Sequence, residues 1–294
     1  MKKIAAISVL ALSVMACSSN NKKTSNEPTA LELSENLAKT ASEDATVFTL
    51  DHHGMAAEEG VEMPQSVATL ISEPHINLPL LEQFPLIGLD LPFKFLIYQE
   101  SDSTGLMAAY TSGEFMARRH GFSSIDFIAE YEQEALRRVK KAGDLPMAKV
   151  KYDLVTERYG MVFIPSEKDF DATIASLKSA VMGQGDTRWF GEIEYHEEAA
   201  KTGVTLPRST LLLFGGPAPG GKAMAQYPRL GLDAFCQKIL VFENQEGRVQ
   251  IVYNDIVEFA KLYYGDYTKA HEVINGRLKQ TFTAALKADE IAQE

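Results

Sequence analysis

The sequence contains two copies of one pattern, and this internal repeat limits the possible folds more than any other feature. Matching positions lie 143 residues apart, or 144 after one inserted residue: Pro64 and Pro207, His53 and His196, Gly88-Leu89-Asp90 and Gly231-Leu232-Asp233, and 94–98 and 238–242. Matches that keep register with so few gaps indicate a duplicated unit. We therefore predict two homologous domains, which suits a chain of 294 residues because one domain typically takes about 100–200 residues.

The second copy shows the elements of one unit. Short apolar or alternating segments predict strands, and apolar stripes at helical spacing predict helices. The expected strands are 159–164, 189–196, 209–214, 238–243 and 248–253, and the expected helices are 169–182, 197–201, 255–264 and 267–286. Strands and helices in mixed order, with hairpins, are typical of the α+β class. Each domain should be a mostly antiparallel sheet packed with helices.

The first copy, residues 30–146, has diverged from the second copy, residues 147–294. A polar segment stands where the first strand of the unit would map, so the first copy is expected to lack that strand. The extra segment 148–155 is a candidate replacement, and it would lock the two halves together. Helix 124–140 is expected to correspond to the last helix of the second copy.

The amino end predicts export. Lys2 and Lys3 precede the apolar run 4–16, which is typical of a signal peptide and too short to span a membrane stably. Residues 14–17 resemble the lipobox of bacterial lipoproteins, in which the Cys is acylated and becomes the first residue after cleavage. We expect a signal peptide over 1–16, a lipid on Cys17 that anchors the chain to a membrane, and a flexible tether over 17–29.

An ordinary secretory signal, with Cys17 in place by chance, is the alternative interpretation of the amino end. If Cys17 is acylated, Ser18 in place of Asp favours the outer membrane, by analogy with lipoprotein sorting. The predicted location is therefore the cell envelope, with the domains facing the periplasm.

The charge balance excludes one class of partner. The chain has 29 basic and 40 acidic residues, a formal net charge of −11 and a pI of about 5.1. Proteins that bind nucleic acid neutralise phosphates with clustered basic residues. We therefore expect no nucleic-acid partner.

The stretch 189–265 carries a set of motifs that resembles a known family. The motif residues are His196, Leu206-Pro207, Phe214-Gly215-Gly216-Pro217, Gly231-Leu232-Asp233, 238–242 and Tyr253-Asn254-Asp255. They are similar to those of the domain of unknown function 302 family, and the first copy looks like a diverged member in which Thr111-Ser112 replaces Asn254-Asp255. The resemblance implies a small α+β fold that pairs into dimers, so the tandem chain should form an intramolecular pseudo-dimer. It implies no established biochemical function.

Each copy places a carboxylate two residues before a histidine. Side chains two apart on a strand share one face, so Glu194 would lie beside His196, and Asp51 beside His53. If the pairing of the copies brings these strands together, the four side chains form a site for zinc or another divalent ion. The alternative is that each His bonds a nearby carboxylate or carbonyl.

Other repeated residues are candidate ligand-binding positions. Asp90 and Asp233 each follow Gly-Leu, and Lys94 and Lys238 also recur, although an Asp–Lys pair or a turn cap would explain them. Residues 216–222 fit the spacing of a phosphate-binding loop, but Ala223 stands where a hydroxyl would ligate magnesium, and two prolines remove N–H donors. We expect instead a tight connection at which Gly215 and Gly216 let backbone or a small ligand approach closely.

No complete catalytic constellation emerges from the sequence, so we expect a binding protein whose ligand is a small molecule or an envelope protein. Cys236 stands beside apolar residues and is expected to be a buried, inert thiol. Four histidines without a counterpart in the other copy are expected to be surface or core residues: His52, His75, His120 and His271. The alternatives are a metal-binding protein or metal-dependent enzyme using the repeated carboxylate and His positions, and a structural envelope scaffold.

Overall fold

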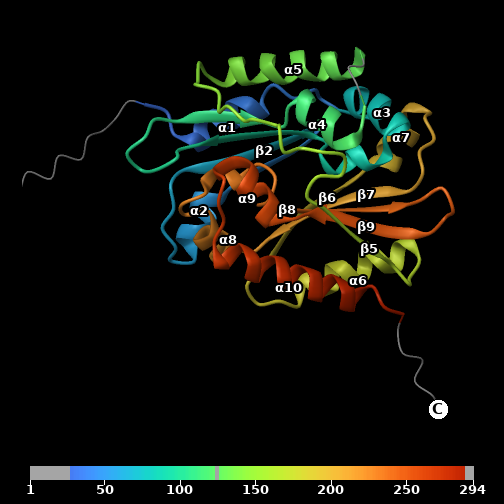
Figure 1. Ribbon diagram of the computed structural model, residues 1–294. Helices are drawn as coiled ribbons and strands as arrows, with labels where there is room; N and C mark the ends of the chain where they lie inside the picture. Colours follow the sequence, from blue (N-terminus) through green and yellow to red (C-terminus); the bar gives the residue numbers. More distant parts are fainter. Residues whose placement is uncertain (1–26, 123–125, 289–294) are drawn as a thin grey trace, which may run out of the picture.

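The computed structural model describes residues 27–122 and 126–288, except for the side chains of residues 126 and 127 (Figure 1). The predicted signal segment 1–16, the lipidation candidate Cys17 and most of the tether 17–29 lie outside these described residues. No helix in the described ranges combines the length and apolar character that a membrane span needs.

The two repeats have the same order of elements except that the first strand of the second repeat, β5, has no counterpart in the first, as predicted. The first repeat contains α1 (Ala30–Ala38), β1 (Thr46–Asp51), α2 (His52–Glu58), β2 (Ser66–Ser72), α3 (Pro74–Gln83), the 3-10 helix η1 (Pro85–Leu89), β3 (Phe93–Tyr98), β4 (Met107–Tyr110), α4 (Gly113–His120) and α5 (Asp126–Ala142). The second repeat contains β5 (Met161–Pro165), α6 (Phe170–Met182), β6 (Arg188–Glu194), α7 (Tyr195–Thr202), β7 (Ser209–Gly215), α8 (Pro217–Met224), the 3-10 helix η2 (Pro228–Gly231), β8 (Gln237–Glu243), β9 (Val249–Asn254), α9 (Ile256–Tyr264) and α10 (Lys269–Ala285). From α1 and α6 onward the elements correspond one to one, which confirms the predicted duplication.

Local sequence signals set the helix ends. The Asp169 side chain accepts a hydrogen bond from the N–H of Ala172 and caps α6. Asp255 caps α9 in the same way, and that helix ends at Gly265 in a left-handed conformation with φ 72°. A side-chain acceptor at the start and glycine at the end are the usual helix boundary signals. They explain why most helix ranges follow from the sequence.

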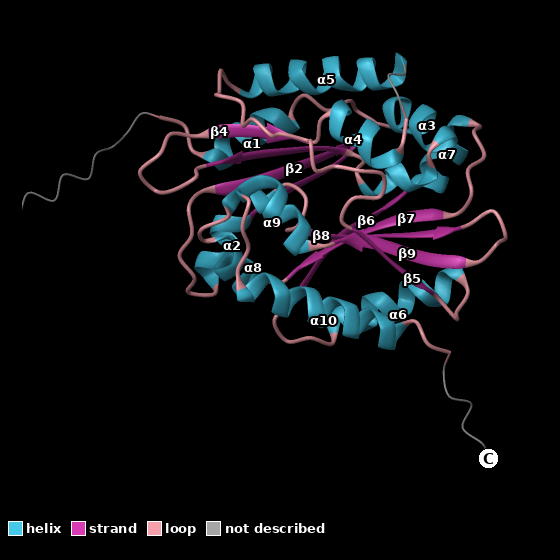
Figure 2. Cartoon of the chain, viewed as in Figure 1, coloured by secondary structure: helices cyan, strands magenta, loops and turns pink. Residues whose placement is uncertain are grey.

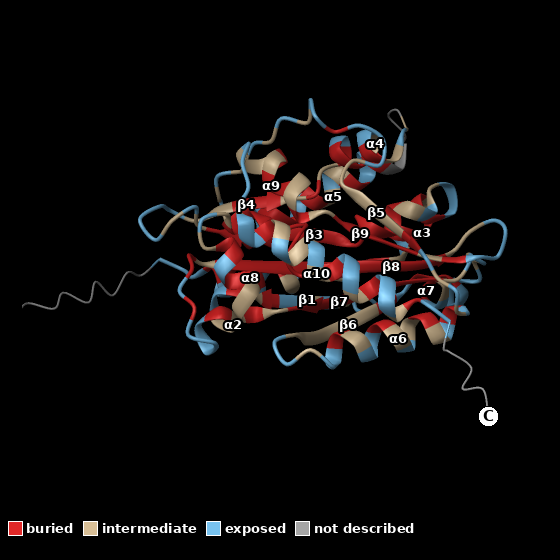
Figure 3. Ribbon diagram, turned by 60° about the horizontal axis from the view of Figure 1, so that its bottom comes forward, coloured by how far each residue is buried: buried red, intermediate tan, exposed pale blue. Residues whose placement is uncertain are grey.

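Each repeat forms its own antiparallel sheet, with strand order β1-β2-β3-β4 in the first and β5-β9-β8-β7-β6 in the second. Helix α1 packs on the first sheet and α5 packs on α1, whereas α6 packs on the second sheet and α10 on α6. Figure 2 shows α5 on one outer side of the molecule and α6 and α10 on the opposite side. Strands β2, β3 and β7 are buried along their whole length because both faces of each sheet are covered. Figure 3 shows this buried core running through both sheets.

The repeats pack on each other reciprocally. Helix α2 contacts α8 and its equivalent α7 contacts α3, while η1 reaches β7 and β8 and η2 reaches β2 and β3. The equivalent residues Phe48 and Gly191 meet each other, and a Cβ on Gly191 would overlap the Phe48 ring. One continuous hydrophobic core includes residues of both repeats. The structure is therefore α+β with two repeats joined as an intramolecular pseudo-dimer, as predicted.

Two local predictions were wrong. Segment 148–155 forms no strand: a single parallel bridge joins Met147 to Ala108 at the edge of β4, and Ala148 donates to the Ala108 carbonyl at 2.8 Å. The Gly and Pro connection after β7 is the helix α8. It forms despite two internal glycines because Pro217 occupies the first helical position, where no N–H is needed, and because Gly221 packs tightly on α2.

Candidate functional site

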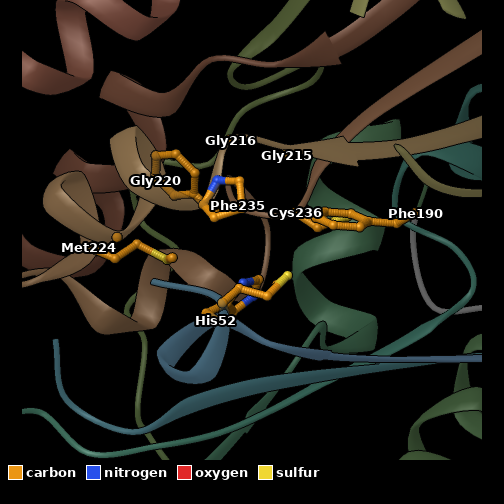
Figure 4. A pocket seen from close by; sticks show the side chains of 11 residues that line it. His52, Phe190, Gly215, Gly216, Gly220, Met224, Phe235 and Cys236 are labelled. Atoms are coloured by element: carbon orange, nitrogen blue, oxygen red, sulfur yellow. The ribbon is translucent and has the colours of Figure 1, made fainter. Parts of the chain in front are cut away.

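A small cavity lies between the repeats, where α2 of the first repeat faces α8 of the second (Figure 4). Its volume is about 20 Å³, which is room for roughly one water molecule. The first repeat contributes His52 and Met55, and the second contributes Phe190, Gly215, Gly216, Pro217, Gly220, Gly221, Met224, Phe235 and Cys236. None of these lining residues is a carboxylate.

His52 is the most unusual residue of this wall. Strand β1 ends at Asp51, whose side chain caps α2 by accepting from the N–H of Gly54, so His52 is the first residue of that helix. The imidazole is 5% exposed, and its Nε2 has no hydrogen-bond partner among the described residues. Burial lowers the pKa of His52 to about 4, although the main chain of Gly231 favours the protonated ring, so the ring is neutral at neutral pH. A buried nitrogen left without a partner typically costs about 1–3 kcal/mol.

The side chain of Cys236, from the second repeat, forms part of the cavity wall. It is a free cysteine, 4% exposed, and its Sγ lies 3.5 Å from the carbonyl oxygen of Gln237. Burial raises the pKa of the thiol to about 11, so it is protonated at neutral pH. The prediction that this thiol is buried is confirmed.

Glycines let the walls of the cavity approach each other. A Cβ on Gly221 would lie 2.6 Å from the Cβ of Ala56, and one on Gly215 would lie 2.8 Å from the Phe190 ring. Real Cβ atoms essentially never come that close. These two positions therefore need glycine: Gly221 for its contact with α2 of the other repeat, and Gly215 for its contact with Phe190 of its own repeat.

The equivalent position on the other side of the pseudo-dimer is filled. Tyr195 stands where the first repeat has His52, and its hydroxyl donates to the carbonyl of Gly88 at 3.0 Å. The tyrosine ring is fully buried. Gly231, the equivalent of Gly88, faces His52, and a Cβ on Gly231 would lie 3.0 Å from the His52 ring. The longer phenol thus occupies space that the imidazole leaves free.

Polar side chains complete the filled position. Glu198, which stands where the first repeat has Met55, accepts a hydrogen bond from the Ser72 hydroxyl at 3.0 Å. Asn77 donates to that hydroxyl at 2.9 Å. Ser72 and Asn77 replace the glycines at positions 215 and 220 of the second repeat. The two equivalent positions therefore differ in both space and chemistry.

A buried network of charged residues also crosses between the repeats. Asp90, Lys94, Asp233 and Lys238 are each 0–3% exposed. Lys94 donates to the Asp233 carboxylate at 2.5 Å and lies 3.6 Å from Asp90. Lys238 instead donates to three main-chain carbonyls at 3.1–3.4 Å. Burial lowers the pKa of Lys238 to about 8.

Arg119 and His120, at the end of α4, hold the other end of this network. Arg119 donates to the Asp90 carboxylate at 2.6 Å and to the side-chain carbonyl of Asn254 at 2.6 Å. His120 Nε2 lies 2.7 Å from the second oxygen of Asp90. Burial alone would raise the pKa of Asp90, but Arg119, Lys94 and His120 hold it far below its usual range. The network therefore joins the repeats twice, through the Arg119–Asn254 hydrogen bond and through the Lys94–Asp233 ion pair.

Comparison with known proteins agrees with this architecture. The model of the family described as Domain of unknown function DUF302 matches residues 22–143 and again residues 162–287. The chain belongs to the DUF302 family. A crystal structure of an uncharacterized conserved DUF302 protein from Bacillus stearothermophilus is similar, with 13% sequence identity and a TM-score of 0.36. The match covers 43% of this chain and 95% of that chain. No curated protein matches the sequence.

The structure does not unite the four predicted metal ligands of the two DUF302 repeats. The prediction that both histidines lie on strands was wrong: strands β1 and β6 end at Asp51 and Glu194, so the histidines lie in the first turns of α2 and α7. His53 Nδ1 lies 2.7 Å from the Met63 carbonyl, and His196 Nδ1 lies 3.0 Å from the Ser209 carbonyl. Each His thus bonds a carbonyl of its own repeat, which was the alternative.

Two of the four predicted metal ligands, Glu194 and His196, lie in a candidate metal group of the second repeat. Glu194, His196 and Glu197 have ligand atoms within 4.8 Å of one another and form the candidate metal group found in the described ranges. Neither Asp51 nor His53 takes part in it. The group is therefore a three-residue site within the second DUF302 repeat.

The remaining predicted ligand-binding residues separate into two sets. Gly215 and Gly216 line the cavity. The four repeated Asp and Lys residues do not line it, and they bond to one another, to Arg119 and to the main chain. The sequence interpretation missed His52, Arg119 and His120 because they have no counterpart of the same type. The signal that could have found them is the difference between the repeats. His52 aligns with Tyr195, and His120 aligns with Tyr263. The Tyr263 hydroxyl donates to Asp233.

Proposed function

We propose that this protein is a lipid-anchored protein of the cell envelope, facing the periplasm, whose paired DUF302 repeats bind a small ligand in the cavity between them. The sequence supports export and anchoring through the basic residues, the short apolar run and Cys17 at the amino end. The paired fold supports binding at the seam because both repeats contribute to the cavity wall.

The unpartnered nitrogen of His52 is the observation that carries the proposal. Buried polar atoms normally have a partner, and the side chain that carries this one lines a cavity, whereas Tyr195 occupies the equivalent position of the other repeat. A ligand of one or a few atoms would satisfy the nitrogen. The glycines that shape the opposite wall keep space for that ligand.

The site favours binding over catalysis. Cys236 is a nucleophilic residue in the wall, but its raised pKa keeps it protonated, whereas catalytic thiols have lowered pKa values. His52 is neutral, and no hydrogen bond joins it to Cys236 in the described structure. A base paired with its nucleophile is the usual mark of covalent catalysis.

Native mass spectrometry of the protein purified untagged from its own envelope tests ligand binding. We expect a mass above that of the polypeptide, lost on denaturation. Gly220→Ala adds a methyl group to the cavity wall, where its Cβ meets Phe235 at 3.4 Å, and it should reduce occupancy. Gly276→Ala is the matched control, since it also lies in a helix and its Cβ would meet nothing within 4 Å. Equal masses for native and denatured wild-type protein would contradict the proposal.

Membrane partition tests the anchor separately. Wild-type protein should enter the detergent phase of a cell extract, and Cys17→Ala should remain in the aqueous phase or retain its uncleaved leader. Unchanged detergent partition of Cys17→Ala from which the leader has been removed would contradict lipid attachment at that residue.

The cluster of Glu194, His196 and Glu197 favours a second candidate function, the binding of a divalent cation such as zinc. Two carboxylates and one imidazole are suitable zinc ligands. Calorimetric titration with zinc should show one site that is lost in His196→Ala and retained in His53→Ala. Equal binding by both variants would contradict this candidate.

A further inference from the structure

We propose that the cavity between the repeats is a site for a soft monovalent metal ion, Cu(I), bound by the imidazole of His52 and the sulfur atoms of Cys236 and Met55. This inference rests on the proposed function, because it names the ligand of the same cavity. The observations that carry it are the donor set, the cavity size, the charge of the wall and the absence of these donors from the equivalent position.

The donor set selects the class of metal. The described wall offers one imidazole nitrogen without a partner, one thiol and the thioethers of Met55 and Met224, and it contains no carboxylate. Thiolate and thioether ligands favour Cu(I), whereas Mg²⁺, Ca²⁺ and Mn²⁺ favour carboxylate and carbonyl oxygens. The wall therefore suits a soft ion and gives a hard ion no anionic oxygen.

The size of the cavity selects a ligand of one atom. A cavity of about 20 Å³ holds roughly one water molecule, whereas sites for organic ligands typically enclose about 300–1,000 Å³. A metal ion fits without displacing the aromatic walls. Phe190 and Phe235 would then shield the ion from solvent.

The charge of the bound state favours a monovalent ion. Binding would replace the thiol proton: Cys236–SH and Cu⁺ give Cys236–S–Cu and H⁺, which leaves for solvent, and copper stays Cu(I) throughout. The thiolate and the ion cancel each other, so the neutral wall gains no net charge. This matters because an unpaired charge in a buried site is very costly. A divalent ion would leave one positive charge uncompensated.

The equivalent position has lost every one of these donors. Tyr195 and Glu198 stand where the first repeat has His52 and Met55, and Pro92 stands where the second repeat has Cys236. Tyr195 and Glu198 are bonded to Gly88 and Ser72. We therefore expect one ion per chain and not two.

Competition between the protein and bicinchoninate for Cu(I), under anaerobic conditions, tests the inference. The full chain carries Cys17→Ser in every sample, so Cys236 is the one thiol present. We expect one Cu(I) per chain, with sulfur and nitrogen neighbours in the X-ray absorption spectrum. Loss of an outer-shell partner alone typically costs about 10–100-fold in metal affinity, so Cys236→Ser should lower affinity by at least about 100-fold, and His52→Phe and Met55→Leu by about 10-fold or more.

Met182→Leu is the matched control, because Met182 is 57% exposed and lies outside the cavity. It should bind Cu(I) as the parent does. Thermal unfolding of each variant without copper separates loss of a ligand from loss of the fold. Affinity that is unchanged in both Cys236→Ser and His52→Phe, or the absence of stoichiometric Cu(I) binding, would overturn the inference.

The two proposals fail in different ways. If an organic molecule or another ion copurifies and is lost in Gly220→Ala, while Cu(I) does not bind, the metal assignment is wrong and the binding function stands. If neither native mass spectrometry nor Cu(I) competition detects a ligand, both are wrong.

Discussion

The two equivalent positions at the seam of the pseudo-dimer have the same backbone and opposite contents. On one side Tyr195 reaches the Gly88 carbonyl and Glu198 bonds Ser72, so the space is filled, although the Oδ1 of Asn77 has no hydrogen-bond partner among the described residues. On the other side the shorter side chain of His52 leaves a cavity, and its Nε2 has no hydrogen-bond partner among the described residues. The filled side shows that this fold can close the space with ordinary side chains. The open side is therefore not a requirement of the fold, and its cost in stability points to a ligand.

The largest expected effect concerns the charges that hold the two sides together. Lys94→Met leaves the Asp233 carboxylate buried without its ion-pair partner from the other repeat and should lower the free energy of unfolding by about 3–5 kcal/mol. Lys238→Met should cost about 1 kcal/mol or less, because Lys238 bonds only carbonyls and its lowered pKa shows that burying its charge already costs energy. Urea denaturation of both variants measures the difference. Equal losses would show that the crossing pair is no more important than its counterpart.

The second effect isolates His52 through pH. The folded pKa of about 4 lies below the value of 6.5 for a free histidine, so only the unfolded chain takes up a proton in this range. Stability contributed at neutral pH is therefore lost as pH falls from 6.5 to 4, by about 3 kcal/mol in total. His52→Phe removes this titration and should show a flatter dependence in urea denaturation at each pH. Parallel curves for the two proteins would show that His52 does not stay neutral in the folded state.

The third effect exchanges the contents of the two positions. Tyr195→His removes ring volume and the hydrogen bond to Gly88, which should cost about 2 kcal/mol. His52→Tyr places the filling side chain on the open side and should leave stability within about 1 kcal/mol of wild type, while removing ligand binding. Thermal unfolding and native mass spectrometry measure the two outcomes. A ligand that still binds His52→Tyr does not occupy this cavity.

The smallest effect concerns an exposed contact found on the open side. Arg188 donates to Glu58 and Glu59 of the other repeat at 2.8 and 2.7 Å, but all three side chains are at least 40% exposed. Because solvent and salt screen such pairs, Arg188→Ala should cost about 0.5 kcal/mol or less, and less still at high salt. A loss comparable to that of Lys94→Met in urea denaturation would contradict the distinction between buried and exposed pairs.

The sequence predicted most of the fold because the repeat supplied two views of each element. Capping residues such as Asp169 and Asp255, and glycines such as Gly265, fixed the helix ends locally. The helix α8 was missed because its glycines and prolines disfavour helix in isolation. What stabilises it is packing on α2, which is a contact between repeats that no local pattern contains.

The candidate site was only partly accessible from sequence. Residues that repeat, such as Lys94 and Asp233, proved to form the buried connection between the halves. The residues that differ, above all His52 against Tyr195, mark the cavity. Residues that are the same in both repeats therefore identify the structural framework, and residues that differ between the repeats identify the site. The side-chain partners of Arg119 lie 29 and 135 residues away along the chain, and this separation explains why that residue was not found.

The connection between α5 and β5 has a consequence for assembly. Two separate polypeptides with these surfaces would sort themselves among three pairings, two of them between identical halves and only one between unlike halves. A single chain delivers one of each half at a fixed ratio and at a permanently high local concentration. Like-with-like pairs are thereby suppressed, and every molecule carries one open position and one closed position. The covalent linker fixes the composition of the pseudo-dimer at one copy of each half. The two halves can therefore differ in function without a mechanism for choosing partners.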